Sequence, residues 1–132
     1  MDFHMQINVK VYPTEDLERV KSAVEKLFSY HNMRIVNNRE NVKTLVFEAE
    51  DMESLSKFKN ILRQDMIRSA VKRVLYQSAN GDKIKFYLNK QVAYVGHVSL
   101  CEPFGESPLE PIEVEIETSN PSELIEWITH FE

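Results

Sequence analysis

The sequence predicts an α+β domain in which a largely antiparallel sheet is covered on one face by helices. Segments that alternate apolar and polar residues, as half-buried strands do, interleave with segments of helical periodicity. Two connections, at residues 38–41 and 79–82, have the length of β-hairpin loops, which favours antiparallel pairing. The chain has 132 residues, of which 42% are hydrophobic, so it can form one sizeable core without disulfides. We therefore expect a single domain over residues 1–132.

The N-terminal third predicts a strand, a helix and a β-hairpin. Residues 4–12 alternate as a half-buried strand. Thr14 is then a suitable N-cap for an amphipathic helix. Residues 33–38 and 42–50 are two β-rich runs joined by a polar connection of hairpin length. Residues 51–54 offer caps for the next helix.

Residues 55–76 have helical periodicity, but their apolar stripe changes direction. At about 100° per residue, the apolar residues before Arg63 lie about 160° from those after Asp65. A straight helix would need a core on two opposite sides. We therefore expect a break at residues 63–65, with Asp65 as the N-cap of a second helix that ends near Tyr76. The alternative is one helix held between the domain and a partner.

The C-terminal half predicts further strands and one closing helix. The strongest turn signal of the chain lies at residues 79–82. The apolar stretch 92–100 is expected to be a strand in which Gly96 marks a bulge. The other elements expected here are a strand at 83–88, a loop at 102–111, a strand at 112–117 and a helix that opens at Pro121.

The charges are distributed unequally along the chain. Residues 1–50 hold seven Lys and Arg against eight Asp and Glu, residues 51–90 hold nine against four, and residues 91–132 hold none against nine. The formal net charge of −5 therefore hides a basic middle and an acidic C-terminal third.

No catalytic or metal-binding motif stands out in the sequence. On one strand, His97 and Cys101 would stand about 13 Å apart, too far for a nucleophile and its base, so Cys101 is interpreted as a buried structural residue. Glu113, Glu115 and Glu117 are interpreted as a solvated sheet face that pairs with lysines. No histidine has metal-ligand spacing, and the three glycines are too dispersed for a phosphate loop. We expect no enzyme activity, no cofactor and no metal.

The sequence also indicates a compartment. Its one cysteine cannot form an internal disulfide, which favours a reducing environment. Its apolar runs are too short to cross a bilayer. We therefore expect a cytoplasmic protein without a membrane partner.

The basic middle of the chain favours RNA or a ribonucleoprotein as a partner. Arg68 and Lys72 are i, i+4 neighbours away from the apolar stripe, so they can face a phosphate backbone together. Asn89 and Gln91 are of the type that contacts base edges or 2′-hydroxyls. The competing interpretation is a homodimer in which the basic middle of one chain meets the acidic C-terminal third of another, without nucleic acid.

Several strings resemble a small archaeal protein family grouped with a predicted RNA-binding domain of unknown function. They are Val-Lys-Val-Tyr-Pro-Thr-Glu-Asp at 9–16, residues 55–63, Phe-Tyr-Leu-Asn-Lys-Gln-Val-Ala at 86–93 with Gly96, and Pro-Leu-Glu-Pro-Ile at 108–112. These strings occur in the same order as in the family, and the resemblance covers nearly the whole chain. The resemblance implies a fold similar to that of the fifth large-subunit ribosomal protein, an archaeal cytoplasmic setting and an RNA-related role, with no established reaction.

The most specific string of this resemblance places Asn89, Lys90 and Gln91 position by position. Residues 64–72 lack the Arg-Gln and Asp-x-Ala-Arg elements of the family's basic helix, and Glu110 stands where a glycine is usual. Asn89–Gln91 also has a structural interpretation, in which these side chains bond to their own backbone at a strand end. The RNA hypothesis has phosphates neutralised by Lys57, Arg63, Arg68, Lys72 and Lys90, with polar contacts from Asn89 and Gln91.

Overall fold

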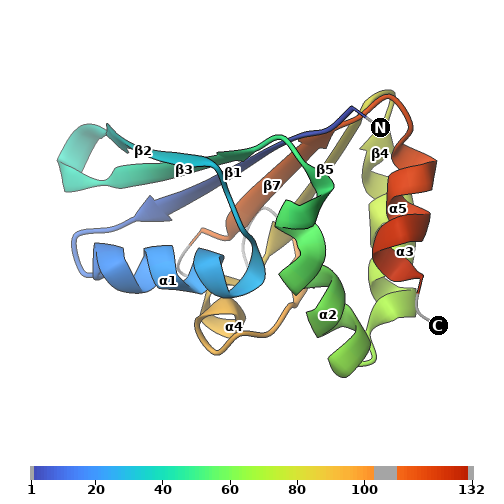
Figure 1. Cartoon of the computed structure of the whole chain (residues 1–132). Helices are drawn as coiled ribbons and strands as arrows, with labels where there is room; N and C mark the ends of the chain where they lie inside the picture. The colour runs from blue at the N-terminus through green and yellow to red at the C-terminus, as the bar shows by residue number, and fades with distance from the viewer. Residues whose placement is uncertain (1, 103–109, 131–132) are drawn as a thin grey trace.

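The computed structural model describes residues 2–102 and 110–130, which form an antiparallel sheet with helices on one face (Figure 1). The strands are β1 (His4–Val11), β2 (Asn32–Asn37), β3 (Lys43–Ala49), β4 (Ala79–Asn80), β5 (Lys83–Leu88), β6 (Leu100–Cys101) and β7 (Ile112–Glu117). The helices are α1 (Leu17–Leu27), α2 (Ser56–Gln64), α3 (Arg68–Ser78), α4 (Lys90–Tyr94) and α5 (Pro121–Thr129), with 3₁₀ turns at Arg39–Asn41 and Met52–Leu55. The predicted α+β class is confirmed.

The strands follow the order β2-β3-β1-β7-β5-β4. Strand β6 also pairs with β5, at Tyr87 and Leu88, whereas β4 pairs with its Lys83 and Ile84. Strand β1 is central, because Ile7 lies opposite Phe47 of β3 on one side and Val114 of β7 on the other. All three side chains are buried. The alternation predicted for residues 4–12 and 112–117 is confirmed, since every second residue of β1 and β7 faces the core.

Both predicted hairpins are present. The β2–β3 connection contains Glu40 and Asn41, each with a φ of 62°. The β4–β5 connection contains Gly81 with a φ of 63°, a conformation that glycine adopts without a steric penalty. The two joints explain why β2 lies beside β3 and β4 lies beside β5.

Aromatic rings connect the helices to the sheet. The ring of Phe58 on α2 stacks on Phe28 at a centroid distance of 5.3 Å and lies 5.8 Å from Phe86 of β5. Helix α1 is capped by Asp16, whose carboxylate accepts the N–H of Glu18. The prediction of Thr14 as the cap is therefore wrong, since the helix begins after a turn that closes between residues 12 and 15.

The break predicted within residues 55–76 is confirmed, and a single straight helix is excluded. However, Asp65 does not cap the second helix. It closes α2 by donating its N–H to the Ile61 carbonyl, and its carboxylate lies 2.8 Å from Nδ1 of His97. The direction changes at Met66, which has a φ of 57°, and α3 has no side-chain cap.

The strand predicted over residues 92–100 is wrong, because helix α4 occupies the first part of this segment. The side chain of Asn89 accepts the N–H of Val92 at 3.0 Å and so caps α4. Gly96, with a φ of 80°, follows the end of that helix and does not mark a bulge. Only Leu100 and Cys101 pair with β5. Cys101 is half-buried and not fully buried as expected.

The C-terminal elements agree with prediction. Pro121 is the first residue of α5, and Asn120 caps that helix by accepting the N–H of Glu123. The loop predicted at 102–111 lies for the most part outside the described residues. None of the helices described is long and apolar enough to cross a membrane.

Candidate nucleic-acid interface

Six of the nine cations in the basic middle of the chain lie on two helices, α2 and α3. Residues 54–81, which span α2 and α3, contain six Lys and Arg and one acidic residue, Asp65. We call these six side chains the α2–α3 surface: Lys57, Lys59, Arg63, Arg68, Lys72 and Arg73. The turn between α2 and α3 lies at the end of the helices far from the sheet (Figure 1). Arg63 and Arg68 thus flank the outermost point of the helical layer.

Four of the six cations of the α2–α3 surface are exposed, and three of the six contact neighbouring helices. Lys59 places its Nζ 4.3 Å from the centre of the Trp127 ring of α5. Lys57 donates to the carbonyl oxygen of Glu25 at 2.8 Å, and Lys72 forms a 3.1 Å ion pair with Glu126 of α5. In the described part of the chain, Arg63 and Arg73 have no ion-pair partner. Met66, 89% exposed, lies between Arg63 and Arg68 in the sequence.

Lys90 lies apart from this surface, in the interior. Its side chain is 1% exposed, and its Nζ donates to the carbonyl oxygen of Lys10 at 2.7 Å and to Oε1 of Glu15 at 3.1 Å. Burial lowers the pKa of Lys90, and the Glu15 carboxylate opposes this shift. In this structure the ammonium group cannot reach a phosphate.

Glu15 is the centre of a buried polar cluster. Its carboxylate, 8% exposed, accepts hydrogen bonds from the backbone N–H of Tyr12 at 3.0 Å and from the Tyr94 hydroxyl at 3.1 Å, besides its ion pair with Lys90. We call Tyr12, Glu15, Lys90 and Tyr94 the Glu15–Lys90 cluster. It connects the β1–α1 junction to α4, so its geometry indicates a structural role.

The other two residues of the Asn-Lys-Gln string have different positions. Asn89 uses its side-chain oxygen to cap α4, which leaves its amide nitrogen as a donor. Gln91 is exposed. The local backbone bond of the structural interpretation is found for Asn89, whereas Lys90 bonds to the distant Lys10 and Glu15. The structure does not bring this string together with the α2–α3 surface.

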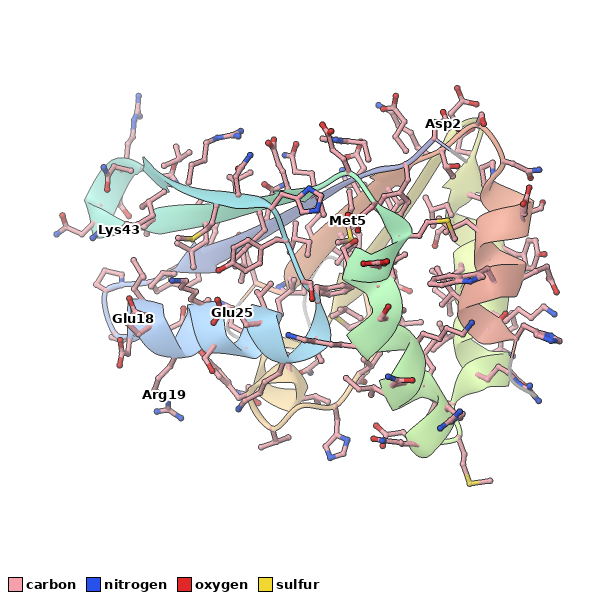
Figure 2. The ribbon with its side chains drawn as sticks, viewed as in Figure 1. Asp2, Met5, Glu18, Arg19, Glu25 and Lys43 are labelled. Atoms are coloured by element: carbon pink, nitrogen blue, oxygen red, sulfur yellow. The ribbon has the colours of Figure 1, made fainter. Side chains whose placement is uncertain are left out.

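A hollow between α1 and α4 adds two cations that the sequence did not indicate. It has a volume of about 210 Å³ and is lined by Glu18, Arg19, Ser22, Lys26 and Tyr94. The Arg19 guanidinium lies 5.5 Å from the centre of the Tyr94 ring, and the side chain of Arg19 points away from the sheet (Figure 2). Because the guanidinium covers that ring face, the face is not open to a stacked base, and the Lys26 ammonium of the same hollow donates to the carbonyl oxygen of Tyr94.

The acidic C-terminal third is partly neutralised on the outer face of the sheet. Glu113 and Glu115 of β7 lie 3.6 Å and 3.5 Å from Lys85 and Lys83 of β5. The predicted pairing of these carboxylates with lysines is confirmed. Within the described ranges, no group of three or more His, Cys, Asp or Glu could hold a metal ion.

Comparison with known proteins shows the family to which the chain belongs. A family model with the description RNA binding matches residues 4–118. A UPF0201 protein of Sulfurisphaera tokodaii is 40% identical over 123 residues, which are 93% of this chain and 84% of that relative. The chain belongs to the UPF0201 family. The resemblance to an archaeal family grouped with RNA binding is thereby confirmed.

Solved structures of UPF0201 and related proteins have the same fold. The crystal structure of the UPF0201 protein from Methanococcus jannaschii has a TM-score of 0.84 at 29% identity, and the match covers 96% of this chain and 99% of that one. A DUF54 protein from Methanothermobacter thermautotrophicus has a TM-score of 0.69 at 15% identity, covers 98% and 100% of the two chains, and shows likeness of fold alone. The expected similarity to the fifth large-subunit ribosomal protein stays a prediction.

Two tyrosines of this UPF0201 chain are expected to ionise late. Burial, aided by Glu15, raises the pKa of Tyr94 to about 12. The hydrogen bond to Glu25 raises the pKa of Tyr30 to about 12. Because both folded-state pKa values exceed the ordinary value of 10.0, the stability they contribute is complete below pH 10 and is lost as the pH rises towards 12.

A spectrophotometric titration of tyrosinate absorbance, followed together with circular dichroism, measures this effect. We expect Tyr94→Phe and Tyr30→Phe each to remove one late step from the titration of the five tyrosines. If all five ionised near pH 10 in the folded protein, the assignment would be wrong.

Proposed function

We propose that this UPF0201 protein is a non-enzymatic RNA-binding module whose α2–α3 surface contacts the phosphate backbone. The observation that carries the proposal is the six-to-one excess of cations over acids in residues 54–81, placed on two helices. The description of the matching family model supports the choice of RNA.

The mechanism is phosphate neutralisation, centred on the turn between α2 and α3. Arg63 and Arg68 flank this turn, and Lys72 follows Arg68 by one helical turn. Guanidinium groups bind phosphate with two parallel hydrogen bonds, which favours arginine at such a position. Lys90 takes no direct part in this mechanism, because its ammonium is held by Glu15.

Ion pairs within one chain favour RNA binding over the alternative homodimer, in which the basic middle of one chain would meet the acidic C-terminal third of another. The carboxylates Glu113 and Glu115 already have lysine partners on their own sheet face. Of the α2–α3 surface, Lys72 is paired with a carboxylate of the C-terminal third, Glu126, at 3.1 Å. An RNA backbone is a polyanion that complements Arg63 and Arg73, which have no ion-pair partner in the described part of the chain.

Binding is tested by titrating the protein against fluorescent structured and single-stranded RNA at several salt concentrations. With four phosphates neutralised on a duplex, log K should fall with log salt with a slope of about −3.6. Saturable binding that weakens in this way is the expected result. Absence of saturable binding at low salt, or binding indifferent to salt, would contradict the proposal.

A further inference from the structure

Strand β2 forms one edge of the sheet and is poorly covered on both faces. It pairs with β3 on one side, and in the described ranges no strand pairs with its other side. Ile35 is 45% exposed and Val36 is 40% exposed. Ile35 lies opposite the buried Leu45 and so belongs to the helix-covered face, whereas Val36 belongs to the outer face. In Figure 1, β2 lies at the edge away from α3 and α5.

The hydrogen bonds of the β2–β3 hairpin show which backbone groups of β2 point outward. The N–H of Asn38 donates to the carbonyl oxygen of Val42 at 2.8 Å. Bonded pairs alternate along an antiparallel ladder, so Val36 and Arg34 also bond to β3. Met33, Ile35 and Asn37 therefore direct their N–H and C=O groups away from β3. This is the pattern that adds a further strand.

We propose that β2 pairs antiparallel with β2 of a second copy of this chain, with Ile35 opposite Ile35 of the partner subunit. A two-fold axis that relates two antiparallel edge strands is perpendicular to the sheet, so residues of the same face must oppose each other. Two registers then pass through the middle of β2: in one, Arg34 lies opposite Arg34 of the partner subunit, and in the other, Ile35 lies opposite Ile35 of the partner subunit. The first places two guanidinium groups opposite each other, and like charges so placed are destabilising.

The register centred on Ile35 satisfies the outward backbone groups. Ile35 exchanges two backbone hydrogen bonds with Ile35 of the partner subunit. On each side of this pair, Met33 of one copy exchanges two backbone hydrogen bonds with Asn37 of the other. Arg34 then lies opposite Val36 of the partner subunit, so no like charges meet. The aliphatic pairs extend the apolar surface on both faces of the joined sheet.

The dimer should be weak and insensitive to salt. Two six-residue strands bury less surface than the roughly 1,200–2,000 Å² of a stable interface, so we expect a dissociation constant of about 10–100 µM. Hydrogen bonds and aliphatic contacts are screened little by salt. This separates the β2 dimer from a dimer formed by basic and acidic segments, which salt would dissociate.

Sedimentation equilibrium from about 1 µM to 1 mM protein tests the proposal, at low and high salt. We expect a monomer–dimer equilibrium that Ile35→Lys shifts at least tenfold towards monomer. Met66→Lys, which changes a still more exposed apolar residue far from β2, should leave the equilibrium unchanged. A monomer at every concentration, or a dimer that salt dissociates and that Ile35→Lys leaves intact, would overturn the proposal.

Cysteine cross-linking tests the register without depending on stability. In a Cys101→Ser background, Ile35→Cys should form a disulfide dimer on mild oxidation, because directly opposed residues have Cα atoms about 5.5 Å apart. Arg34→Cys should cross-link more slowly, since the two Arg34 positions are offset along the strands. Faster cross-linking through Arg34→Cys than through Ile35→Cys would show that the proposed pairing is wrong.

Discussion

Replacing Lys90 by Met is expected to lower the free energy of unfolding by about 3–5 kcal/mol. The change removes the ammonium from a cluster in which Lys90 is 1% and Glu15 is 8% exposed. The Glu15 carboxylate then stays buried with the Tyr12 N–H and the Tyr94 hydroxyl as donors, and neither carries a positive charge. Urea denaturation at neutral pH measures the loss.

Two further variants separate the buried pair from a general effect of losing a lysine. Lys85→Met removes the exposed ion pair with Glu113 and should change stability by less than about 1 kcal/mol. Adding Glu15→Gln to Lys90→Met should recover part of the loss, because an amide is less costly to bury than a charge. If Lys90→Met were as mild as Lys85→Met, the cluster would not have the structural role given to it.

Neutralising the two arginines beside the α2–α3 turn is expected to weaken RNA binding by about 100-fold at low salt, at about tenfold for each lost charged contact. The variant Arg63→Gln with Arg68→Gln keeps side chains of similar length on both helices. If each arginine neutralises one phosphate, the log–log salt slope becomes less steep by about 1.8. Anisotropy titrations at several salt concentrations give both quantities.

The matched control removes the same number of charges elsewhere. Lys83→Gln with Lys85→Gln alters the outer face of the sheet, where both lysines pair with glutamates. It should leave RNA affinity within about threefold of the parent protein, because these cations already have partners. Equal losses from the two double variants would mean that net charge, and not the α2–α3 surface, determines binding.

Local pattern was sufficient to predict most of the fold. The alternation of β1 and β7 and the turn at Gly81 depend on neighbours in the sequence, so they could be read without the structure. Helix α4 was missed because five residues, Lys90–Tyr94, are too few to establish a helical period. Its cap, Asn89, is the available signal, but an asparagine at this place is equally consistent with an RNA contact.

The candidate site was predictable only in part, because burial depends on distant residues. The cations of α2 and α3 lie off the apolar stripe of each helix. Four of them are exposed, and Lys59 and Lys72 are half-buried. Lys90 differs because its partner, Glu15, is 75 residues away in the sequence. The hollow beside Tyr94 was missed for the same reason, since α1 and α4 form it together.

The central place of β1 has a consequence for the order in which the protein folds. Its first neighbour, β3, is complete by Ala49, but its second neighbour, β7, begins only at Ile112. During synthesis, the side of β1 that pairs with β7 therefore stays unpaired until more than half of the chain has followed it. Closure of that long loop contributes an entropic barrier, so the β1–β7 contact is expected to form late in folding.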